Sequence, residues 1–315
     1  MDKTLDVVAL GEGMLEFNQT QAGHPEYLQG FGGDTSNVVI AAARAGARTA
    51  YLSRVGADPF GARLLALWAH EGVDIRGVER DASAPTGIYF VTHGPNGHEF
   101  SYYRAGSAAS RMTADWLRAG PAAQIIASAQ FLHISGISLA ISGSARETVH
   151  AALQLAREAG TRVAFDTNLR LRLWSLDRAR SAIEAAIAWS DVFLPSLEDI
   201  TTLTGLNDPD AIADWGHALG ARQIVLKLGD RGVLTSADGE RHRLPGLQVP
   251  LVDATGAGDC FCGNLLAQLS AGASLPEAAG YANAAAALSV QGFGAVAPLP
   301  HPAQVRALLR TLAGT

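Results

Sequence analysis

The chain has 315 residues, a net charge of −6 and a pI near 5.8. This acidic balance excludes a basic nucleic-acid-binding surface, and the length is sufficient for one large buried core. The N-terminal sequence MDKTLDVVALGEG enters an apolar run without the features of a secretory signal, which predicts a cytoplasmic protein. We find no repeat and no linker, so we expect a single domain spanning 1–315.

Short β-rich runs alternate with stretches of helical spacing along most of the chain. The runs are LDVVAL (5–10), TAYLSRV (49–55), FLHIS (131–135), TRVAFD (161–166), DVFLP (191–195) and QIVLKL (223–228). This alternation predicts an α/β fold with a doubly wound, mostly parallel sheet flanked by helices. Ligands of such sheets bind beyond the carboxyl ends of the strands, so we expect the functional residues at that edge.

Residues 86–104 depart from the alternation, because two strand-like segments flank the turn HGPNGH at 93–98. Together with the segment 11–31 they predict a small β-sheet lid, formed by about 11–31 and 86–108. The exposed strand edges of such a lid favour self-association, so we expect a homo-oligomer through the lid.

Strand alternation places Phe100, Tyr102 and Arg104 on one face of the second lid strand. Two interpretations of Arg104 stay open: it binds the carboxylate of a substrate, or it is a solvated surface side chain. Arg170, in the segment LRLRL, is open in the same way, because that segment could be an amphipathic strand with both arginines in water.

Two stretches near the C-terminus, 260–276 and 278–305, contain no Asp, Glu, Lys or Arg. Asn, Gln, Gly and Pro interrupt their hydropathy, so they predict buried alanine-rich helices and no membrane span. Cys260 and Cys262 are too close in sequence for ordinary disulfide geometry and lack the partners of a zinc site. We expect both to be small packing residues.

Two glycine-rich motifs remain once the common nucleotide-binding patterns are excluded. Neither of the two lysines, Lys3 and Lys227, fits the phosphate-binding pattern GxxxxGK[ST]. Glu16 occupies the position of the third glycine of a dinucleotide-binding motif. The motifs are GFGGDTSNVVIAAARAG at 30–46 and DATGAGD at 253–259. A glycine-rich turn that opens a helix leaves backbone N–H groups free for an anion. Asp259 at this turn is either a simple helix-capping acid or a catalytic one.

The two motifs together resemble the two signatures of the ribokinase-like (PfkB) family of sugar kinases. The matching residues are Gly32, Gly33 and Asn37 in the first motif, and Gly256, Gly258 and Asp259 in the second. VLKLGDRG at 225–232 resembles the nucleotide loop of the family, and the order and spacing agree across essentially the whole chain. The resemblance implies a ribokinase-like fold that transfers the γ-phosphoryl group of ATP to a sugar hydroxyl with Mg²⁺.

Within this family, GEGMLEF, GFGGDTSN, FSYYRAGSAAS, LHISGISLAIS and FDTNLRLRLWS resemble bacterial 2-keto-3-deoxygluconate kinases. This implies phosphorylation of an acidic keto sugar at its C6 hydroxyl to give 2-keto-3-deoxy-6-phosphogluconate. The alternatives are a kinase of a neutral sugar of the fructose or ribose type, and a non-catalytic sugar-binding regulator. Two candidate carboxylate-binding arginines favour the acid sugar, and the intact TGAGD favours catalysis.

The resemblance also implies roles for individual residues. Asp259 is expected to be the general base, and the turn of Gly256, Ala257 and Gly258 is expected to form the anion hole from the N–H groups of 257–259. The expected sugar contacts are Gly33, Asn37, Tyr89, Tyr102, Arg104 and Arg170. The expected nucleotide contacts are Lys227, Gly229, Gly232, Asn283 and Ser196.

The metal-binding residues depart from the pattern of the family. Where the family usually has Asn-x-x-Glu, this chain has SLED, so either Asp199 or Glu198 is expected to organise hydrated Mg²⁺. The usual Asp-Thr-Thr is here DAT at 253–255, which leaves a monovalent-cation site open.

Overall fold

Within residues 3–94 and 97–313, which the computed structural model describes, the centre is a nine-stranded sheet. Its order is β13 (Glu240–Leu244), β12 (Val233–Ala237), β11 (Gln223–Lys227), β10 (Val192–Phe193), β9 (Arg162–Asp166), β8 (Ala129–Ser135), β1 (Leu5–Leu10), β4 (Thr49–Gly56) and β5 (Val78–Asp81). Of these described strands, β11 to β5 run parallel, and β12 pairs antiparallel with both β11 and β13. The predicted doubly wound, mostly parallel sheet is confirmed.

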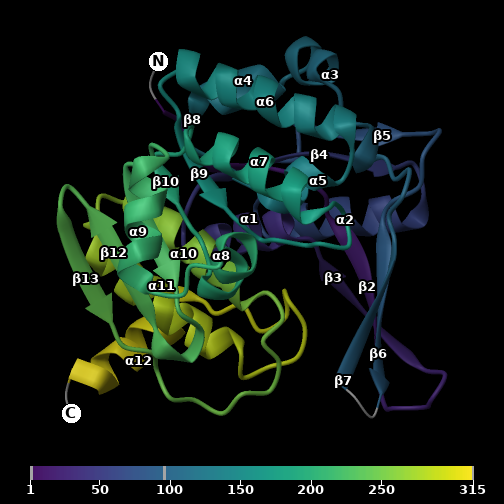
Figure 1. Ribbon diagram of the computed structural model, residues 1–315. Helices are drawn as coiled ribbons and strands as arrows, with labels where there is room; N and C mark the ends of the chain where they lie inside the picture. Colours follow the sequence, from purple (N-terminus) through teal and green to yellow (C-terminus); the bar gives the residue numbers. More distant parts are fainter. Residues whose placement is uncertain (1–2, 95–96, 314–315) are drawn as a thin grey trace.

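A separate sheet within the described chain has four strands, in the order β3 (Tyr27–Gly32), β2 (Met14–Gln19), β6 (Ile88–Gly94) and β7 (Gly97–Tyr103). Figure 1 shows this sheet extending away from the main sheet. Except for Gly32 at the end of β3, its strands lie within the two segments expected to form a lid, and we call it the lid. Pro95 and Asn96, at the centre of the expected turn, lie outside the described residues.

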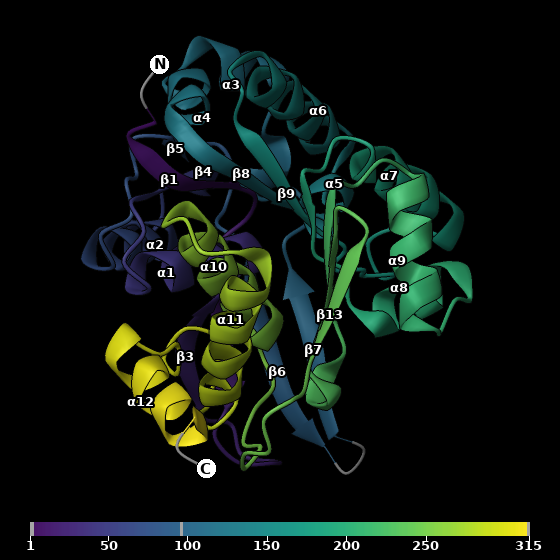
Figure 2. The same ribbon diagram turned by 90° about the vertical axis from the view of Figure 1, so that its left-hand side faces the viewer.

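Helices cover both faces of the main sheet (Figure 2). One face carries α1 (Asp34–Arg44), α2 (Pro59–His70), α10 (Ala257–Ser270), α11 (Leu275–Ser289) and α12 (Pro302–Ala313). The other carries α3 (Ala114–Ala119), α4 (Ala122–Ser128), α5 (Gly136–Ala140), α6 (Gly143–Glu158), α7 (Leu176–Ile187), α8 (Leu197–Thr204) and α9 (Pro209–Ala218). The 3₁₀ turns are η1 (Ala109–Arg111) and η2 (Gly229–Arg231). In the part of the chain that is described, no helix is both long and apolar enough to pass through a bilayer.

The apolar runs form central strands because their alternate residues pack on opposite faces. In β1, Val8 and Leu10 enter the apolar cluster under α6, while Val7 and Ala9 enter the clusters under α1 and α10. Phe17 of the lid packs against the same cluster as Trp68 of α2. We therefore propose that the main sheet and the lid form one domain.

One connection differs from the predicted alternation of strand and helix. β1 leads into lid strands β2 and β3 as expected, but β11 leads into the β12–β13 hairpin. The two-residue turn of that hairpin is Asp238-Gly239, with φ of 52° and 81°. Asp-Gly is a preferred sequence for such a turn, because both positions take positive φ.

Candidate active site

Asp259 lies in the first turn of α10, directly after the glycine-rich turn. Gly256 is the N-cap residue with a φ of 75°, and a Cβ there would lie 2.9 Å from the Cβ of Ala295, so this position requires glycine. Asp259 is buried, and its Oδ2 accepts a hydrogen bond from Asn37 Nδ2 at 2.8 Å. Asn37 is on α1, so this contact joins the two glycine-rich motifs across 222 residues of sequence.

The start of α10 offers fewer free backbone donors than expected. The N–H of Ala257 donates to Ala254 O at 3.2 Å, so it is already engaged. Within the described chain, the N–H groups of Gly258 and Asp259 have no acceptor. Because free N–H groups at a helix start attract anions, these two form the candidate anion hole. The role expected of Ala257 stays a prediction.

Charged residues from three other elements face Asp259. Asp34 opens α1, Asp166 ends β9 and Lys227 ends β11, where its Nζ lies 2.8 Å from Asp166 Oδ2. Burial, with Asp34 and Asp166 nearby, raises the pKa of Asp259 from an ordinary value near 3.8 to about 8. Burial acts to lower the pKa of Lys227, but Asp166, Cys262 and Asp199 together outweigh it, so the pKa is raised. A carboxylate with a pKa near neutrality is suited to accept a proton.

Aromatic side chains line the lid face that looks toward Asp259. The ring of Tyr102 lies 5.5 Å from that of Tyr89 and 6.2 Å from that of Phe100. Tyr103 packs against Phe90 on the opposite face, which confirms the predicted alternation. Burial raises the pKa of Tyr89, and the nearby Asp259 contributes to the same shift. The inner face of the lid and Asp259 therefore form one candidate site.

The two candidate carboxylate-binding arginines have different surroundings. Arg104 directly follows β7, is largely buried, and donates from Nε to Glu12 Oε2 at 2.7 Å. It is not a solvated surface side chain. Arg170 is exposed in the segment after β9, where Nη1 donates to Leu169 O at 2.8 Å. That segment is a loop, so the amphipathic strand is also wrong.

The model of the "pfkB family carbohydrate kinase" matches residues 4–302. The chain belongs to the pfkB family. It is 36% identical to the 2-dehydro-3-deoxygluconokinase of Thermoproteus tenax, over 98% of this chain and 95% of that protein. It is 34% identical to fructokinase-1 of Zea mays, over 96% of this chain and 97% of that protein. It is similar in fold to the crystal structure of a PfkB protein from Polaromonas sp. JS666, with a TM-score of 0.87 and 32% identity. The match covers 96% of this chain and 100% of that chain.

The two glycines that follow β11 in this pfkB kinase have different surroundings. Gly229 has a φ of 66°, and a Cβ there would meet nothing within 4 Å. Gly232 has a φ of 95°, and a Cβ there would lie 2.1 Å from Leu244 O. Glycine is therefore needed at this position so that the end of β13 can pack against it. A Cβ on Gly258 would lie 3.6 Å from Lys227 Nζ, so Lys227 lies beside the turn that opens α10.

Two other expected nucleotide contacts have structural roles. Ser196 is the N-cap of α8 and accepts a hydrogen bond from the N–H of Asp199 at 3.1 Å. Asn283 Nδ2 donates to Pro245 O at 2.9 Å, which ties α11 to the segment after β13. Their contacts with a nucleotide stay predictions.

Asp199 suits a water-mediated metal contact better than Glu198. Glu198 is exposed, whereas Asp199 accepts the N–H of Leu169 at 3.1 Å, and its pKa is raised by burial and by Asp166. In the described residues, no group of three or more His, Cys, Asp or Glu side chains could hold a metal ion. Mg²⁺ in phosphate-transfer sites keeps several waters and binds mainly the substrate phosphates, which such a site allows.

The carboxylate of Asp253 joins two loops near the start of α10. Oδ1 accepts from the N–H and the hydroxyl of Thr255 at 2.9 and 2.6 Å, and Oδ2 accepts from the N–H of Gly294 at 2.9 Å. A monovalent-cation site at 253–255 stays a prediction.

Sequence reasoning missed three acids of this site: Glu12, Asp34 and Asp166. Asp34 is buried, which raises its pKa, and its Oδ2 lies 3.3 Å from Asn168 Nδ2. Its position inside the first glycine-rich motif was an available signal. Asp166 ends a predicted strand at the edge where ligands were expected.

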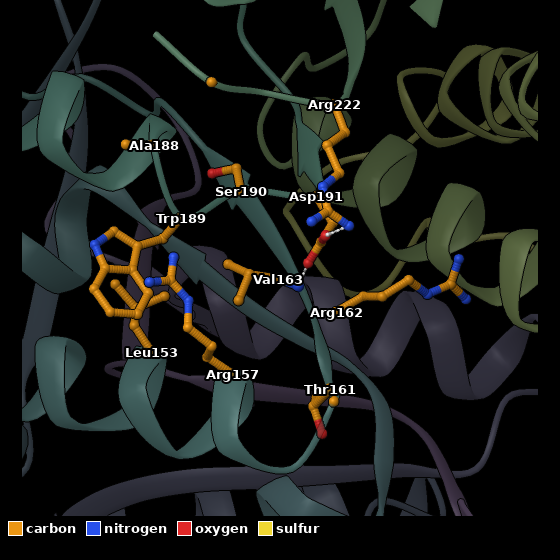
Figure 3. Close-up of a pocket in the computed structure, with 12 residues that line it drawn as sticks. Leu153, Arg157, Thr161, Arg162, Val163, Ala188, Trp189, Ser190, Asp191 and Arg222 are labelled. Atoms are coloured by element: carbon orange, nitrogen blue, oxygen red, sulfur yellow. Dashed lines mark hydrogen bonds and ion pairs between the residues drawn. The ribbon is translucent and has the colours of Figure 1, made fainter. Parts of the chain in front are cut away.

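A second concavity, of about 350 Å³, lies at the opposite edge of the main sheet (Figure 3). Arg157 stacks on Trp189 with its guanidinium carbon 3.6 Å from the ring centroid, and Arg222 lies 3.3 Å from Asp191. Figure 3 shows Arg162 pointing away from Arg157, so these charges do not converge on one ligand position. We therefore keep the opposite edge, with Asp259, as the candidate active site.

Proposed function

We propose that this chain is an ATP-dependent kinase of 2-keto-3-deoxygluconate that phosphorylates the C6 hydroxyl. The observation that carries the proposal is the buried Asp259, with a pKa of about 8, beside two free N–H groups and opposite a lid that carries Tyr89 and Tyr102. The likeness to 2-dehydro-3-deoxygluconokinase, another name for a kinase of this sugar acid, supports the choice of substrate. A kinase that uses ATP works where ATP is abundant, so the proposal includes a cytoplasmic location.

In the proposed reaction, Asp259 accepts the proton of the C6 hydroxyl while the sugar oxygen bonds to the γ-phosphorus. The bond from that phosphorus to the bridging oxygen breaks, and ADP leaves. The N–H groups of Gly258 and Asp259 and the ammonium of Lys227 stabilise the charge on the transferring group.

ATP and Mg²⁺ are the proposed co-substrate and metal. Bound Mg²⁺ supplies neutralisation of the phosphate charge, and Asp199 is the residue that would hold its water. We propose that the nucleotide is bordered by Lys227, Gly229, Gly232, Asn283 and Ser196.

Arg170 is the proposed partner of the substrate carboxylate. Glu12 already neutralises Arg104, whereas Arg170 has no ion pair in the described part of the chain. We therefore assign the sugar oxygens to Arg104, together with Gly33, Asn37, Tyr89 and Tyr102. The second candidate function is a neutral-sugar kinase. It is favoured by the 34% identity to a fructokinase, which is close to the 36% identity to a 2-dehydro-3-deoxygluconokinase.

We expect Arg170→Ala to lower kcat/KM for 2-keto-3-deoxygluconate about 10- to 100-fold, because charge-assisted hydrogen bonds contribute about 1.5–3 kcal/mol. Weak activity on fructose should fall by less than about threefold, since that sugar has no carboxylate. The matched control is Arg172→Ala on the same loop, whose Nη1 donates to Phe100 O at 2.8 Å. In this control variant, kcat/KM should change by the same factor for both sugars. Equal losses on both sugars in Arg170→Ala would contradict the carboxylate assignment.

We further propose a homo-oligomer through the lid. Leu28 and Tyr103 on the lid are 68% and 65% exposed, and β3 and β7 are its edge strands. Light scattering should give a mass of at least twice 32.8 kDa, and the mass of one chain would contradict the proposal.

A further inference from the structure

Glu12 lies where all four described lid strands join the main body. β2 begins two residues later, at Met14. Gly33 directly follows β3, and a Cβ there would lie 2.3 Å from Glu12 O. Gly87 directly precedes β6, and its Cβ would lie 2.6 Å from Glu12 Oε1. Arg104 directly follows β7 and donates to Glu12 Oε2 at 2.7 Å. Glu12 therefore contacts every junction between the lid and the body.

The carboxylate of Glu12 is buried and fully engaged. Its side chain is 1% exposed, and that of Arg104, its ion-pair partner, is 10% exposed. Oε1 accepts from the Ser107 hydroxyl at 2.5 Å, and Oε2 accepts from Arg104 Nε. Removing one partner of a buried ion pair leaves the other charge uncompensated. This pair therefore holds the guanidinium of Arg104 in one orientation.

The guanidinium of Arg104 has more N–H groups than its described contacts use. Its Nη2 lies beside Glu12 Oε2 as an ion pair, but it is buried and makes no hydrogen bond with any residue in the described ranges. Arg104 also acts electrostatically on Asp34, opposing the rise that burial causes in the pKa of Asp34. The guanidinium is therefore paired with Glu12 and lies near Asp34, the first residue of α1. A substrate oxygen would satisfy the unused donor.

We propose that Glu12 is a positioning residue that acts through Arg104. It orients the guanidinium so that Nη2 can reach a substrate oxygen, and it fixes the root of the lid so that Tyr89 and Tyr102 face Asp259. Glu12 itself does not contact the substrate. This inference rests on the proposed sugar-kinase function and extends it to the residue that sets the geometry of sugar binding.

The test is a double-mutant cycle of Glu12→Gln, Arg104→Ala and the double variant, measured with the sugar that the wild type phosphorylates best. Each single variant should raise the KM for sugar by about tenfold or more, while the KM for ATP changes by less than about twofold. Because Glu12 acts through Arg104, the two effects should not add. The KM for sugar of the double variant should be within about threefold of the higher of the two single-variant KM values.

The matched control is Glu71→Gln, which breaks the largely buried ion pair of Glu71 with Arg44, two residues outside the proposed site. This variant should lower Tm without changing the KM for sugar. If Glu12→Gln does not fold, Ser107→Ala removes the other contact of Glu12 and should raise the KM for sugar about two- to tenfold.

Three results would overturn the inference: an unchanged KM for sugar in the Glu12 or Ser107 variant, an equal rise in the KM for ATP, or a double variant equal to the product of the singles. A wild type that prefers a neutral sugar would instead overturn the proposed substrate. The cycle on that sugar would still decide the role of Glu12.

Discussion

Asp259→Asn is expected to lower kcat by about 10²- to 10⁴-fold, because the site keeps its shape and loses its general base. Asparagine has the same size as aspartate, and its amide oxygen can still accept the hydrogen bond that Asn37 donates to Asp259 at 2.8 Å. Binding of sugar and ATP, measured by calorimetry, should therefore remain. A variant that keeps more than about a tenth of the wild-type kcat would contradict the assignment.

The same variant should be more stable than the wild type at neutral pH. The folded protein holds the Asp259 proton up to a pH of about 8, whereas an unfolded aspartate releases it near 3.8. The wild type therefore loses stability as pH rises between these values, and asparagine does not titrate. The gain in Tm should be small at pH 4 and larger at pH 8. A gain that shrinks over this interval would contradict the burial argument.

Gly258→Val is the second variant with a large expected effect, a loss of about 10²- to 10³-fold in kcat. A Cβ at Gly258 would lie 3.6 Å from Lys227 Nζ, which is ordinary contact, so the fold can accept a side chain. The two further methyl groups of valine would enter the space between this ammonium and the free N–H groups, where the phosphoryl group must bind. Steady-state kinetics with saturating sugar would measure the loss.

The control for this variant is Gly280→Val on the neighbouring helix α11. Gly280 is also helical, and its nearest neighbour to an added Cβ is Leu244 Cδ1 at 4.0 Å. It therefore reports the effect of valine in a helix away from the phosphate pocket. The control should keep wild-type kcat. Equal kcat in both variants would mean that the turn at Gly258 is only structural.

The sequence predicts the central strands well, because a run such as 5–10 is apolar at every position that packs on either face of a sheet. It predicts edge elements poorly. β5 has only one buried residue in four, Asp81, so no apolar pattern marks it. The β12–β13 hairpin carried a usable signal in Asp238-Gly239, but the expectation of a helix after each parallel strand obscured it.

Individual residues of the candidate site are predictable only where they belong to a local motif. Asp259 follows from its glycine-rich turn, and the edge of the sheet follows from topology. The partners of Arg104 do not: Glu12 is 92 residues away and is brought to it by the lid strands between them. The bond from the N–H of Ala257 to Ala254 O is likewise a detail of backbone geometry that the sequence does not reveal.

The most direct test of the proposed function is sugar-dependent release of ADP from MgATP, measured with 2-keto-3-deoxygluconate, fructose and ribose and with Asp259→Asn as the blank. We expect kcat/KM for 2-keto-3-deoxygluconate to exceed that for either neutral sugar by at least about tenfold, since only this sugar can use charge-assisted bonds to Arg170. A higher kcat/KM for fructose or ribose, or no release of ADP that depends on sugar, would contradict the proposal.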